Sequence, residues 1–138
     1  YVKKHGIKGF SNLILIDYID DIEKLNSLNK FSKILFLSSR EDPFPAVVLN
    51  SFSVGTPVIA FAKSGGFVDI VINDKTGYIV EPYNTDSIVD KIYELIFDNF
   101  KLSEMEKNCI QESKKHNFDD YCRFLIKLFE INDKRKKY

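Results

Sequence analysis

The sequence predicts an α/β fold whose centre is a doubly wound, parallel β-sheet. Three observations lead to this fold class: short apolar runs of strand length alternate with helix-like segments, these runs are apolar at nearly every position, and polar loops with glycine or proline follow two consecutive runs. Strands that alternate with helices form parallel sheets through right-handed crossovers. Because the carboxyl ends of parallel strands share one edge, the two loops are expected to meet where such sheets bind ligands.

Size and composition indicate one globular domain. The chain has 138 residues, of which 44% are hydrophobic and 29% are charged, which is enough for a hydrophobic core. The 20 basic residues balance the 20 acidic ones, so no overall field would recruit nucleic acid. No apolar stretch approaches the roughly 18 residues of a membrane span. Cys109 and Cys122 match no metal or redox spacing, which favours reduced, mostly buried thiols in a cytoplasmic protein.

The two ends of the chain indicate how much of the domain is present and whether the protein contacts a membrane. Tyr1 is not a typical start, and the stretch that ends at Gly6 is typical of the last turn of a helix. We therefore expect a partial domain over residues 1–138, with the first βα unit lying upstream. The charge run Asp133–Lys137 favours a solvated, frayed terminus, and contact with the inner face of a membrane is the minority interpretation.

The first half of the chain contains three predicted strands and two predicted helices. Asn12–Ile16 is a continuous apolar run, typical of a buried parallel strand. A helix opens at Asp20 and Asp21, whose charges complement its dipole, and its apolar residues recur at helical spacing: Ile22, Leu25 and Leu28. Lys33–Leu37 is the second strand. A largely apolar helix then runs from about Pro45 to Val54, Gly55 suits its left-handed C-cap, and Pro57–Phe61 is the third strand.

The second half is expected to be mainly helical. Phe67–Ile72 predicts a short helix, Asn73–Gly77 a turn, and Gly77–Val80 a fourth, short strand. Three amphipathic helices are predicted after it, over residues 86–97, 103–116 and 118–132. The last of them carries its apolar residues along one stripe: Phe118, Tyr121, Cys122, Leu125, Leu128 and Phe129.

The loop before the second helix is suited to an anion. Pro43 and Pro45 fix their own backbone angles and restrict the residues before them, so the loop is stiff. The free amides of Phe44, Ala46 and Val47 are expected to point above the helix start. Those amides and the helix dipole favour a group such as a diphosphate.

Two polar side chains near this loop have both structural and functional interpretations. Asn50 carries the one side-chain amide in a helix whose neighbouring residues are mostly apolar, and a buried amide needs hydrogen-bond partners. Those partners are either nearby backbone groups or the hydroxyls of a ligand. Asp42 is either a cap that braces the loop or a carboxylate that faces a ligand.

A second loop supplies Gly65 and Gly66, followed by Asp69. Glycines allow a backbone to approach a ligand closely, although most such pairs are only turns. Asp69 could equally be a favourable acid in a first helical turn. These interpretations gain weight because the fold is expected to bring this loop and Asp42 to one edge. His5 and His116 have no partner pattern, and neither a Ser-His-Asp arrangement nor metal-ligand spacing is present.

Residues 31–80 resemble the C-terminal, donor-binding domain of retaining nucleotide-sugar glycosyltransferases of the group 1 or family 4 type, which have the GT-B fold. The resemblance rests on an ordered series of motifs: Ser39–Pro45, Gly55–Ala60, Gly65-Gly66, Asp69 and Thr76-Gly77. These enzymes make lipopolysaccharide, capsule and other glycans. The flanking segments fit more loosely, so the resemblance covers nearly the whole chain and implies a Rossmann-like half of a two-domain enzyme.

The resemblance implies roles for individual residues. Asp42 would contact the donor sugar and help to stabilise developing positive charge, and Asn50 would bind the ribose hydroxyls. The amides of Phe44, Ala46 and Val47 would hold the diphosphate, while the backbone at Ile19 would contact the nucleobase. Gly65, Gly66 and Asp69 would lie near the sugar and phosphates. No metal or other cofactor is expected, because amides and an upstream basic pair would neutralise the diphosphate.

The chain departs from the family pattern at three acidic positions. Asp42, Asn50 and Asp69 stand where the family has Glu, so one charge is lost and all three side chains are one methylene shorter. We therefore expect weaker or altered nucleotide binding. The acceptor domain and the basic pair would lie upstream of Tyr1, so this chain alone is expected to be inactive.

Three functions remain open at this point. The first is the donor-binding part of an active glycosyltransferase, which transfers a sugar to a glycan or lipid-linked acceptor. The second is a non-catalytic module that binds a nucleotide-sugar or stabilises a partner. The third is an unrelated Rossmann-like domain, which would be favoured if the loops at Asp42 and Gly65 lay on opposite edges of the sheet.

Overall fold

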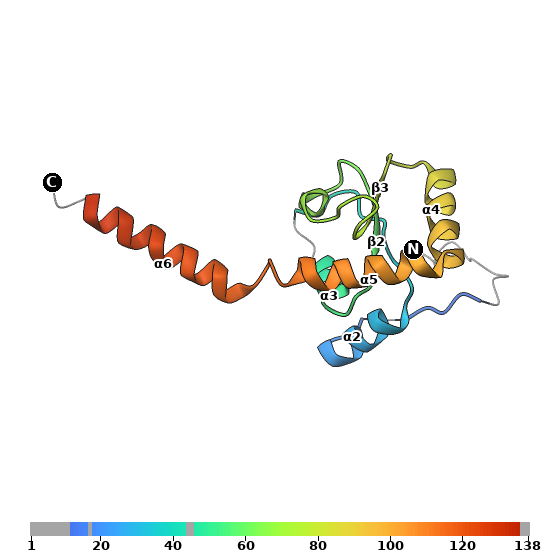
Figure 1. The fold of residues 1–138 in the computed structure, drawn as a ribbon, viewed down its shortest axis with the longest axis horizontal. Coiled ribbons are helices and arrows are strands. Elements are labelled where there is room, and N and C mark those ends of the chain that lie inside the picture. Colours follow the sequence, from blue (N-terminus) through green and yellow to red (C-terminus); the bar gives the residue numbers. More distant parts are fainter. Residues whose placement is uncertain (1–11, 17, 44–45, 136–138) are drawn as a thin grey trace.

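Three parallel strands form the centre of the protein. The computed structural model describes residues 12–16, 18–43 and 46–135. Within them the strands are β1 (Leu35–Leu37), β2 (Val58–Phe61) and β3 (Gly77–Val80), in the order β1-β2-β3. Leu35 pairs with Val58, which in turn pairs with Gly77. Figure 1 shows the sheet between helices, so the predicted α/β fold with a parallel sheet is confirmed.

Helices alternate with the strands and continue after them. Their bounds are α2 Ile22–Phe31, α3 Ala46–Ser53, a 3-10 turn at Gly66–Asp69, α4 Thr85–Phe97, α5 Asn99–Ser113 and α6 Phe118–Arg135. Asp21 caps α2 as expected, because its carboxylate accepts hydrogen bonds from the amides of Glu23 and Lys24. The helix α5 begins earlier than predicted because Asp98 caps it, accepting from the Lys101 amide at 2.9 Å.

Both faces of the sheet are covered by apolar side chains. Successive residues of β2 point to opposite faces, so Val58 and Ala60 lie in one cluster and Ile59 lies in the other. The first cluster also contains Val48 and Phe52 of α3, together with Phe67, Ile70, Val71 and Cys109. The second contains Tyr78 and Val80 of β3 with residues of α4 and α5: Ile88, Leu95, Leu102 and Met105. Burial on both faces explains why the central strand β2 is continuously apolar, whereas Phe36 of the edge strand β1 is 40% exposed.

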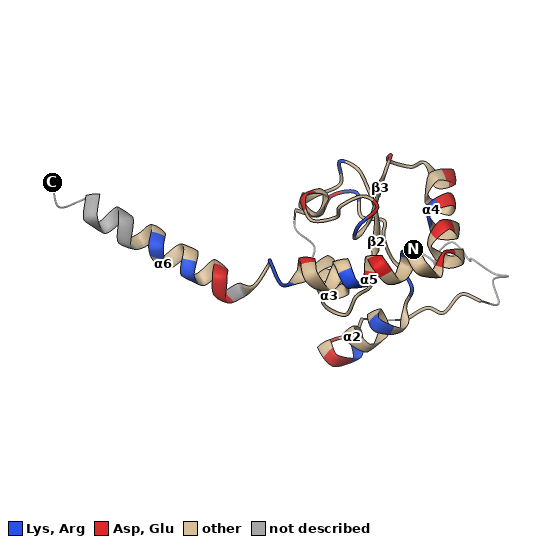
Figure 2. Ribbon diagram, in the orientation of Figure 1, with Lys and Arg blue, Asp and Glu red and all other residues tan. Residues whose placement is uncertain are grey.

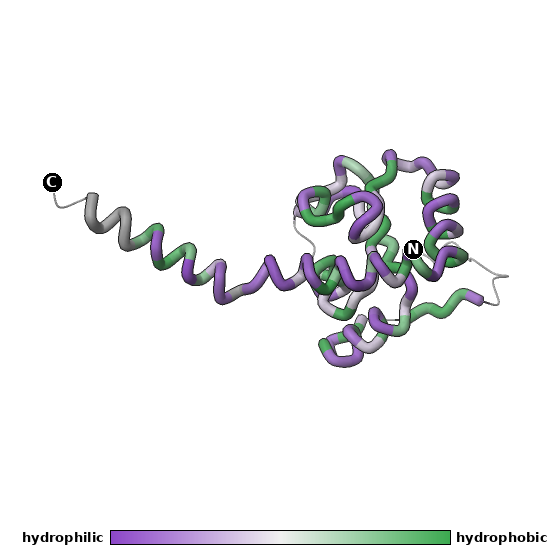
Figure 3. The backbone as a smooth tube through the Cα atoms, in the orientation of Figure 1, coloured by the Kyte–Doolittle hydropathy of each residue, from purple (hydrophilic) through white to green (hydrophobic). Residues whose placement is uncertain are grey.

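The strand predicted at residues 12–16 is wrong for this structure. Leu13–Ile16 lie outside the sheet, and their side chains are 47% to 82% exposed. Figure 3 shows this apolar segment running outside the packed body. A parallel strand is stable only when neighbouring strands accept and donate its backbone hydrogen bonds. Among the described residues no strand lies beside this segment, so its apolar sequence alone does not make it a strand.

The burial predicted for Cys122 is only partly confirmed, and the apolar stripe of the last helix is largely exposed. The helix α6 forms as expected, but it projects away from the rest of the protein (Figure 1). Tyr121, Leu128 and Phe129 of the predicted stripe are exposed, the last by 72%, and Cys122 is half-buried. Helical periodicity shows that a helix has an apolar face, but the face is buried only where another element packs against it. The Phe118 side chain lies outside the described residues.

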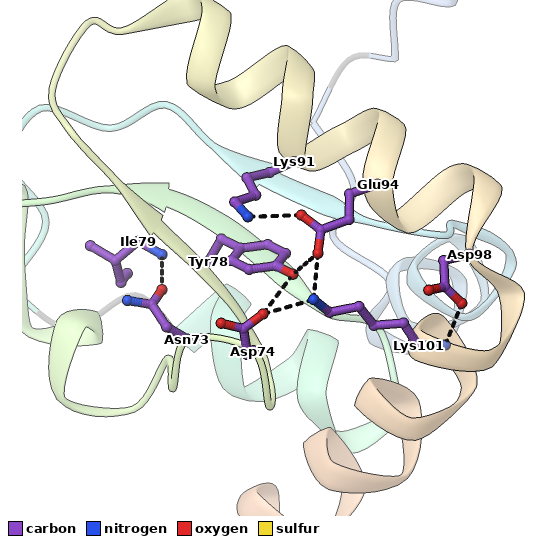
Figure 4. A network of polar contacts seen from close by, with 8 residues as sticks. All are labelled: Asn73, Asp74, Tyr78, Ile79, Lys91, Glu94, Asp98 and Lys101. Carbon is purple, nitrogen blue, oxygen red and sulfur yellow. Dashed lines mark hydrogen bonds and ion pairs between the residues drawn. The ribbon is translucent and has the colours of Figure 1, made fainter.

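A charged network joins the amino end of β3 to α4 and α5, and we call it the Tyr78 network (Figure 4). The Lys101 ammonium donates to Asp74 Oδ1 at 2.7 Å and to Glu94 Oε1. The Tyr78 hydroxyl lies 2.8 Å from Glu94 Oε1 and 3.1 Å from Asp74 Oδ1. Lys91 lies over the Tyr78 ring at 4.3 Å and donates to Glu94 Oε2 at 2.7 Å. Every charged member therefore has a partner of opposite sign.

These contacts shift the pKa values of the network. The Lys101 hydrogen bond, with Lys91 adding to it, lowers the pKa of Glu94 to about 2. The Lys101 hydrogen bond, followed by that of Tyr78, also lowers the pKa of Asp74. Burial is the main reason that the pKa of Tyr78 is raised. All these groups therefore keep their ordinary charges at neutral pH, and the network links β3, α4 and α5.

Acidic and basic side chains are otherwise interspersed along the chain (Figure 2). In the described part of the protein, no helix combines the length and the apolar character that crossing a bilayer requires.

Candidate functional site

The two loops singled out in the sequence meet at the carboxyl end of the sheet. The Asp42 amide donates to the Ser64 carbonyl at 2.9 Å. The Gly66 amide lies 3.1 Å from the Pro43 carbonyl and 3.3 Å from that of Asp42. Asp42 and Gly65 form a parallel bridge that continues the pairing of β1 with β2. The loops therefore lie on one edge, and the arrangement that would have favoured an unrelated domain is absent.

Gly65 is required for this meeting of the loops. A Cβ atom at this position would lie 1.8 Å from the Asp42 carbonyl oxygen, far inside the contact distance of two atoms. Only glycine lets the two backbones approach so closely. The glycine predicted for close approach thus contacts the neighbouring loop of this chain.

A hollow opens beside the bridge, and we call it the Asp42 hollow. Its volume is about 320 Å³, and it is lined by Glu41, Asp42, Pro43, Lys63, Ser64 and Gly65. Asp42 is half-buried there, whereas Glu41 and Lys63 are exposed. The hollow offers a carboxylate, an ammonium and a hydroxyl to a ligand, so it suits a polar, hydroxyl-bearing molecule.

A second hollow adjoins the first, and we call it the Tyr83 hollow. Its volume is about 220 Å³, and it is lined by Ser39, Arg40, Phe61, Ala62, Lys63, Ser64, Pro82 and Tyr83. These residues follow the three strands in turn, so all three strand ends contribute to it. Lys63 and Ser64 line both hollows, which makes the two hollows one continuous surface at this edge.

The predicted site residues on α3 and at the end of the 3-10 turn do not line the Asp42 hollow. Ala46 opens α3, Val47 follows it, and Asn50 is half-buried on the same helix. None of the three lines the Asp42 hollow. Asp69 is exposed at the end of the 3-10 turn that follows Gly65 and Gly66. Roles for these residues toward a ligand therefore stay predictions.

Two further predicted residues cannot be joined to this edge. Ile19 is half-buried in the segment before α2, and it belongs to neither hollow. Its predicted place depended on a strand at residues 12–16, which does not form. Phe44 lies outside the described residues.

Sequence reasoning did not single out Arg40, Lys63 and Tyr83. Each comes two or three residues after the last residue of its strand, Leu37, Phe61 or Val80. Parallel strands place the residues that follow their carboxyl ends close together. The similar position of the three residues after their strands could therefore have predicted that they lie together. It was not used because no local motif contains the three residues.

A larger hollow of about 610 Å³ lies elsewhere, where α6 leaves α5. It is lined by His116, Tyr121 and Phe124 together with Leu49, Lys115, Asn117 and Asp120. It contains no residue of the two loops, and its wall is the base of the projecting α6. Its size reflects that projection, so we place the candidate site at the sheet edge.

The described residues hold few other reactive groups. Within them no group of His, Cys, Asp and Glu side chains is arranged to hold a metal ion. Burial raises the pKa of the Cys109 thiol to about 12, and its sulfur lies 3.4 Å from the Thr76 carbonyl oxygen. This thiol therefore stays protonated and acts as a packing residue.

Comparison with protein families identifies the lineage of the chain. The profile of the family described as "Glycosyl transferases group 1" matches residues 3–116. The chain belongs to this family. The residues that match include both loops of the candidate site.

Relatives and solved structures agree with this family. Sucrose-phosphate synthase of Zea mays is 25% identical over 104 residues, which are 75% of this chain and 10% of that enzyme. The sucrose-phosphate synthase structure from Thermosynechococcus elongatus matches with a TM-score of 0.83 and 22% identity, over 97% of this chain and 33% of the other. The C-terminal domain of a group 1 glycosyltransferase, LpcC of Francisella tularensis, matches with a TM-score of 0.68 and 27% identity, over 83% of this chain and 57% of the other.

These likenesses establish the fold as the C-terminal, Rossmann-like part of a GT-B glycosyltransferase. The chain spans about 10% of the length of the maize relative and 8% of a second sucrose-phosphate synthase, from Arabidopsis thaliana.

Proposed function

We propose that this chain is the donor-binding part of a retaining glycosyltransferase of the hexosyltransferase type. The enzyme would transfer a sugar from a nucleotide-diphosphate sugar to a glycan or lipid-linked acceptor. The observation that carries the proposal is the Asp42–Gly65 bridge, which joins both family motifs at the carboxyl end of the sheet. In open α/β sheets this edge binds ligands. The hollow beside the bridge is lined by three charged side chains, Glu41, Asp42 and Lys63, which can hydrogen-bond to the hydroxyls of a sugar.

Each residue has a proposed part in binding the donor. Asp42 faces the donor sugar from the Asp42 hollow, where a carboxylate would stabilise positive charge at the anomeric carbon. The amides at the start of α3, near Ala46 and Val47, bind the diphosphate through the helix dipole. Asn50 binds the ribose hydroxyls by accepting one hydrogen bond and donating another. No metal is needed in this arrangement.

The transfer step itself follows from this binding. The bond from the anomeric carbon to the diphosphate oxygen breaks, and the diphosphate keeps the electron pair. The acceptor hydroxyl oxygen forms the new bond to the anomeric carbon with retained configuration, and its proton passes to the departing diphosphate oxygen. An N-terminal domain would hold the acceptor, so the isolated chain would be inactive. The enzyme would act in the cytoplasm, at the inner face of the membrane if its acceptor is lipid-linked.

A titration of the full-length natural protein tests donor binding. Nucleoside diphosphates at about a hundred times their dissociation constant should add about 2.7 kcal/mol to the free energy of unfolding. In a transfer assay with labelled donor, Asp42→Asn should lower the rate by about a hundredfold while donor binding changes little. Asp90→Asn, on the exposed face of α4, is the matched control and should change neither quantity. Binding without any transfer would favour a non-catalytic module, and absence of binding would end the proposal.

A second variant tests the role of Asn50. Asn50→Glu should lower the dissociation constant for a nucleoside diphosphate about tenfold, because a charge-assisted hydrogen bond to the ribose is stronger than a neutral one. Ser53→Glu adds the same charge at an exposed position of the same helix and should not tighten binding. An unchanged or weaker affinity in Asn50→Glu would contradict this role.

A further inference from the structure

The Tyr83 hollow is lined by two cations that form no ion pair within the described part of the chain. Arg40 and Lys63 both line it. Among the described residues neither forms an ion pair, although the chain as a whole has no net charge. The Arg40 guanidinium lies over the Tyr83 ring, 5.6 Å from its centroid. That contact holds the cation at the hollow and leaves its N–H groups free to donate to an anion.

An aromatic wall stands beside these cations. The Phe61 ring packs edge-on against Phe36 at 5.7 Å and lies 5.8 Å from the Tyr83 ring. Tyr83 is 67% exposed. Part of this wall is therefore open to a ligand. An aromatic face with polar groups around it suits a ring that has both apolar and hydroxyl-bearing sides, such as a sugar.

The backbone supports a ligand role for the same hollow. Lys63 has a φ angle of +62° and Tyr83 one of +63°. This left-handed conformation is uncommon for residues other than Gly, Asn and Asp. Strained residues of this kind gather at sites where a side chain must be held in one place. Here both of them line one hollow, on the loops that follow β2 and β3.

The volume of the hollow limits the size of its occupant. About 220 Å³ is less than the roughly 300 Å³ at the lower end of ordinary ligand pockets. A whole nucleotide-sugar does not fit such a space, whereas a single sugar ring with one anionic group does. The Asp42 hollow adjoins it through Lys63 and Ser64, so an occupant would lie beside the proposed donor sugar.

We propose that the Tyr83 hollow is a subsite for an anionic sugar unit of the acceptor, with Arg40 and Lys63 binding its phosphate or carboxylate and Tyr83 contacting its ring. The subsite lies on the donor-binding part rather than on a separate acceptor domain. This inference rests on the proposed function, because it assigns the occupant to the acceptor.

Calorimetric titration of the full-length natural protein tests the subsite with defined probes. Glucose 6-phosphate supplies a phosphate, glucuronate supplies a carboxylate, glucose is neutral, and inorganic phosphate lacks the ring. At least one of the anionic sugars should bind about tenfold more tightly than glucose. The tighter of the two identifies which anion the subsite prefers. Equal binding of glucose and both anionic sugars would overturn the proposal.

Variants of the lining residues test whether the anionic sugar binds in the Tyr83 hollow. Arg40→Gln and Lys63→Asn should each weaken binding of the anionic sugar about tenfold, and asparagine suits the left-handed backbone at position 63. Tyr83→Asn should weaken binding of the sugar more than binding of inorganic phosphate, because it removes the ring contact as well as the support for Arg40. Lys75→Gln, an exposed lysine in the turn before β3, is the control and should change nothing. Unchanged affinity in the Arg40 and Lys63 variants would overturn the proposal.

A nucleoside diphosphate titration separates this inference from the proposed function. If nucleoside diphosphates bind and the anionic sugars do not, the subsite is wrong and the donor site stands. If a nucleoside diphosphate displaces the anionic sugar competitively, the hollow belongs to the donor and the subsite is wrong. If the anionic sugars bind while no nucleoside diphosphate does, the proposed function fails, and with it the assignment of the occupant to an acceptor.

Discussion

The two ends of the same small sheet differ in whether their charged side chains form ion pairs among the described residues. At the amino end, the Tyr78 network pairs Asp74 and Glu94 with Lys91 and Lys101. At the carboxyl end, the charged residues that line the two hollows form no ion pair among the described residues: Arg40, Glu41, Asp42 and Lys63. One end uses its charges to hold helices to the sheet. At the other end the charges are available to the proposed ligands.

The backbone shows the same division. At the amino end, side chains satisfy main-chain groups: the Thr76 hydroxyl accepts from the Ile72 amide at 2.8 Å, and the Ser51 hydroxyl donates to the Thr56 carbonyl at 2.9 Å. Left-handed backbones occur at both ends, at Asp74 before β3 and at Lys63 and Tyr83 on the loops of the carboxyl end, but Asp adopts this conformation more readily than Lys or Tyr. We therefore expect that substitutions at the amino end mainly change the free energy of unfolding, and that substitutions at the carboxyl end also change ligand binding.

The largest expected effect comes from Gly65→Ala, at the carboxyl end. The added Cβ would overlap the Asp42 carbonyl oxygen, so the loops would have to separate. We expect a loss of about 3 kcal/mol in the free energy of unfolding, measured by urea denaturation. The control is Gly55→Ala, whose added Cβ would meet its neighbours at an ordinary 3.4 Å although φ is +92°. That variant should lose only about 1 kcal/mol, and an equal loss in both would contradict the role given to Gly65.

The next effect concerns the amino end. Lys101→Met keeps the length of the side chain but leaves Asp74 and Glu94 without their shared cation. We expect a loss of about 1.5 kcal/mol in the free energy of unfolding, since the pair is only partly buried. Lys107→Met, at an exposed position of the same helix, should change it by less than about 0.5 kcal/mol. Similar values for both variants would show that the network contributes little.

Acid should weaken the amino end through Glu94. Its folded pKa of about 2 lies below the ordinary value of 4.5, so the unfolded chain takes up a proton first as the pH falls. The stabilisation is complete above about pH 5 and is lost as the pH approaches 2. We expect it to amount to about 1–2 kcal/mol, because solvent screens a carboxylate that is 32% exposed. Urea denaturation at pH 7, 5 and 3 measures it, and Glu94→Gln should flatten the dependence. An equally steep dependence in that variant would assign the acid effect to other groups.

The smallest expected effect has the opposite sign. Lys63→Gly relieves a left-handed backbone at the carboxyl end, so the free energy of unfolding should rise by about 0.5–1 kcal/mol. The same variant should bind anionic sugars less tightly. Lys75→Gly, where φ is not positive, should be neutral or destabilising. A loss of stability in Lys63→Gly would show that this end is not strained for binding.

Features that depend on near neighbours in the chain were predicted well. Asp21 begins α2, Gly55 ends α3 in the left-handed conformation, and β2 and β3 lie where short apolar runs were found. Caps, turns and strand propensity are set within a few residues of the chain. The meeting of Asp42 with Gly65 was also predicted, because two loops that follow consecutive parallel strands share an edge.

Apart from that meeting of the two loops, features that depend on distant partners were not predicted from the sequence. Leu13–Ile16 has the sequence of a buried strand but no strand beside it, and α6 has an apolar face that nothing among the described residues covers. Arg40, Lys63 and Tyr83 come together only because the strands of one sheet place their ends side by side. Local sequence sets which segments are helical or extended. Whether a segment is paired, buried or part of a hollow depends on residues far along the chain, and these are brought together only by folding.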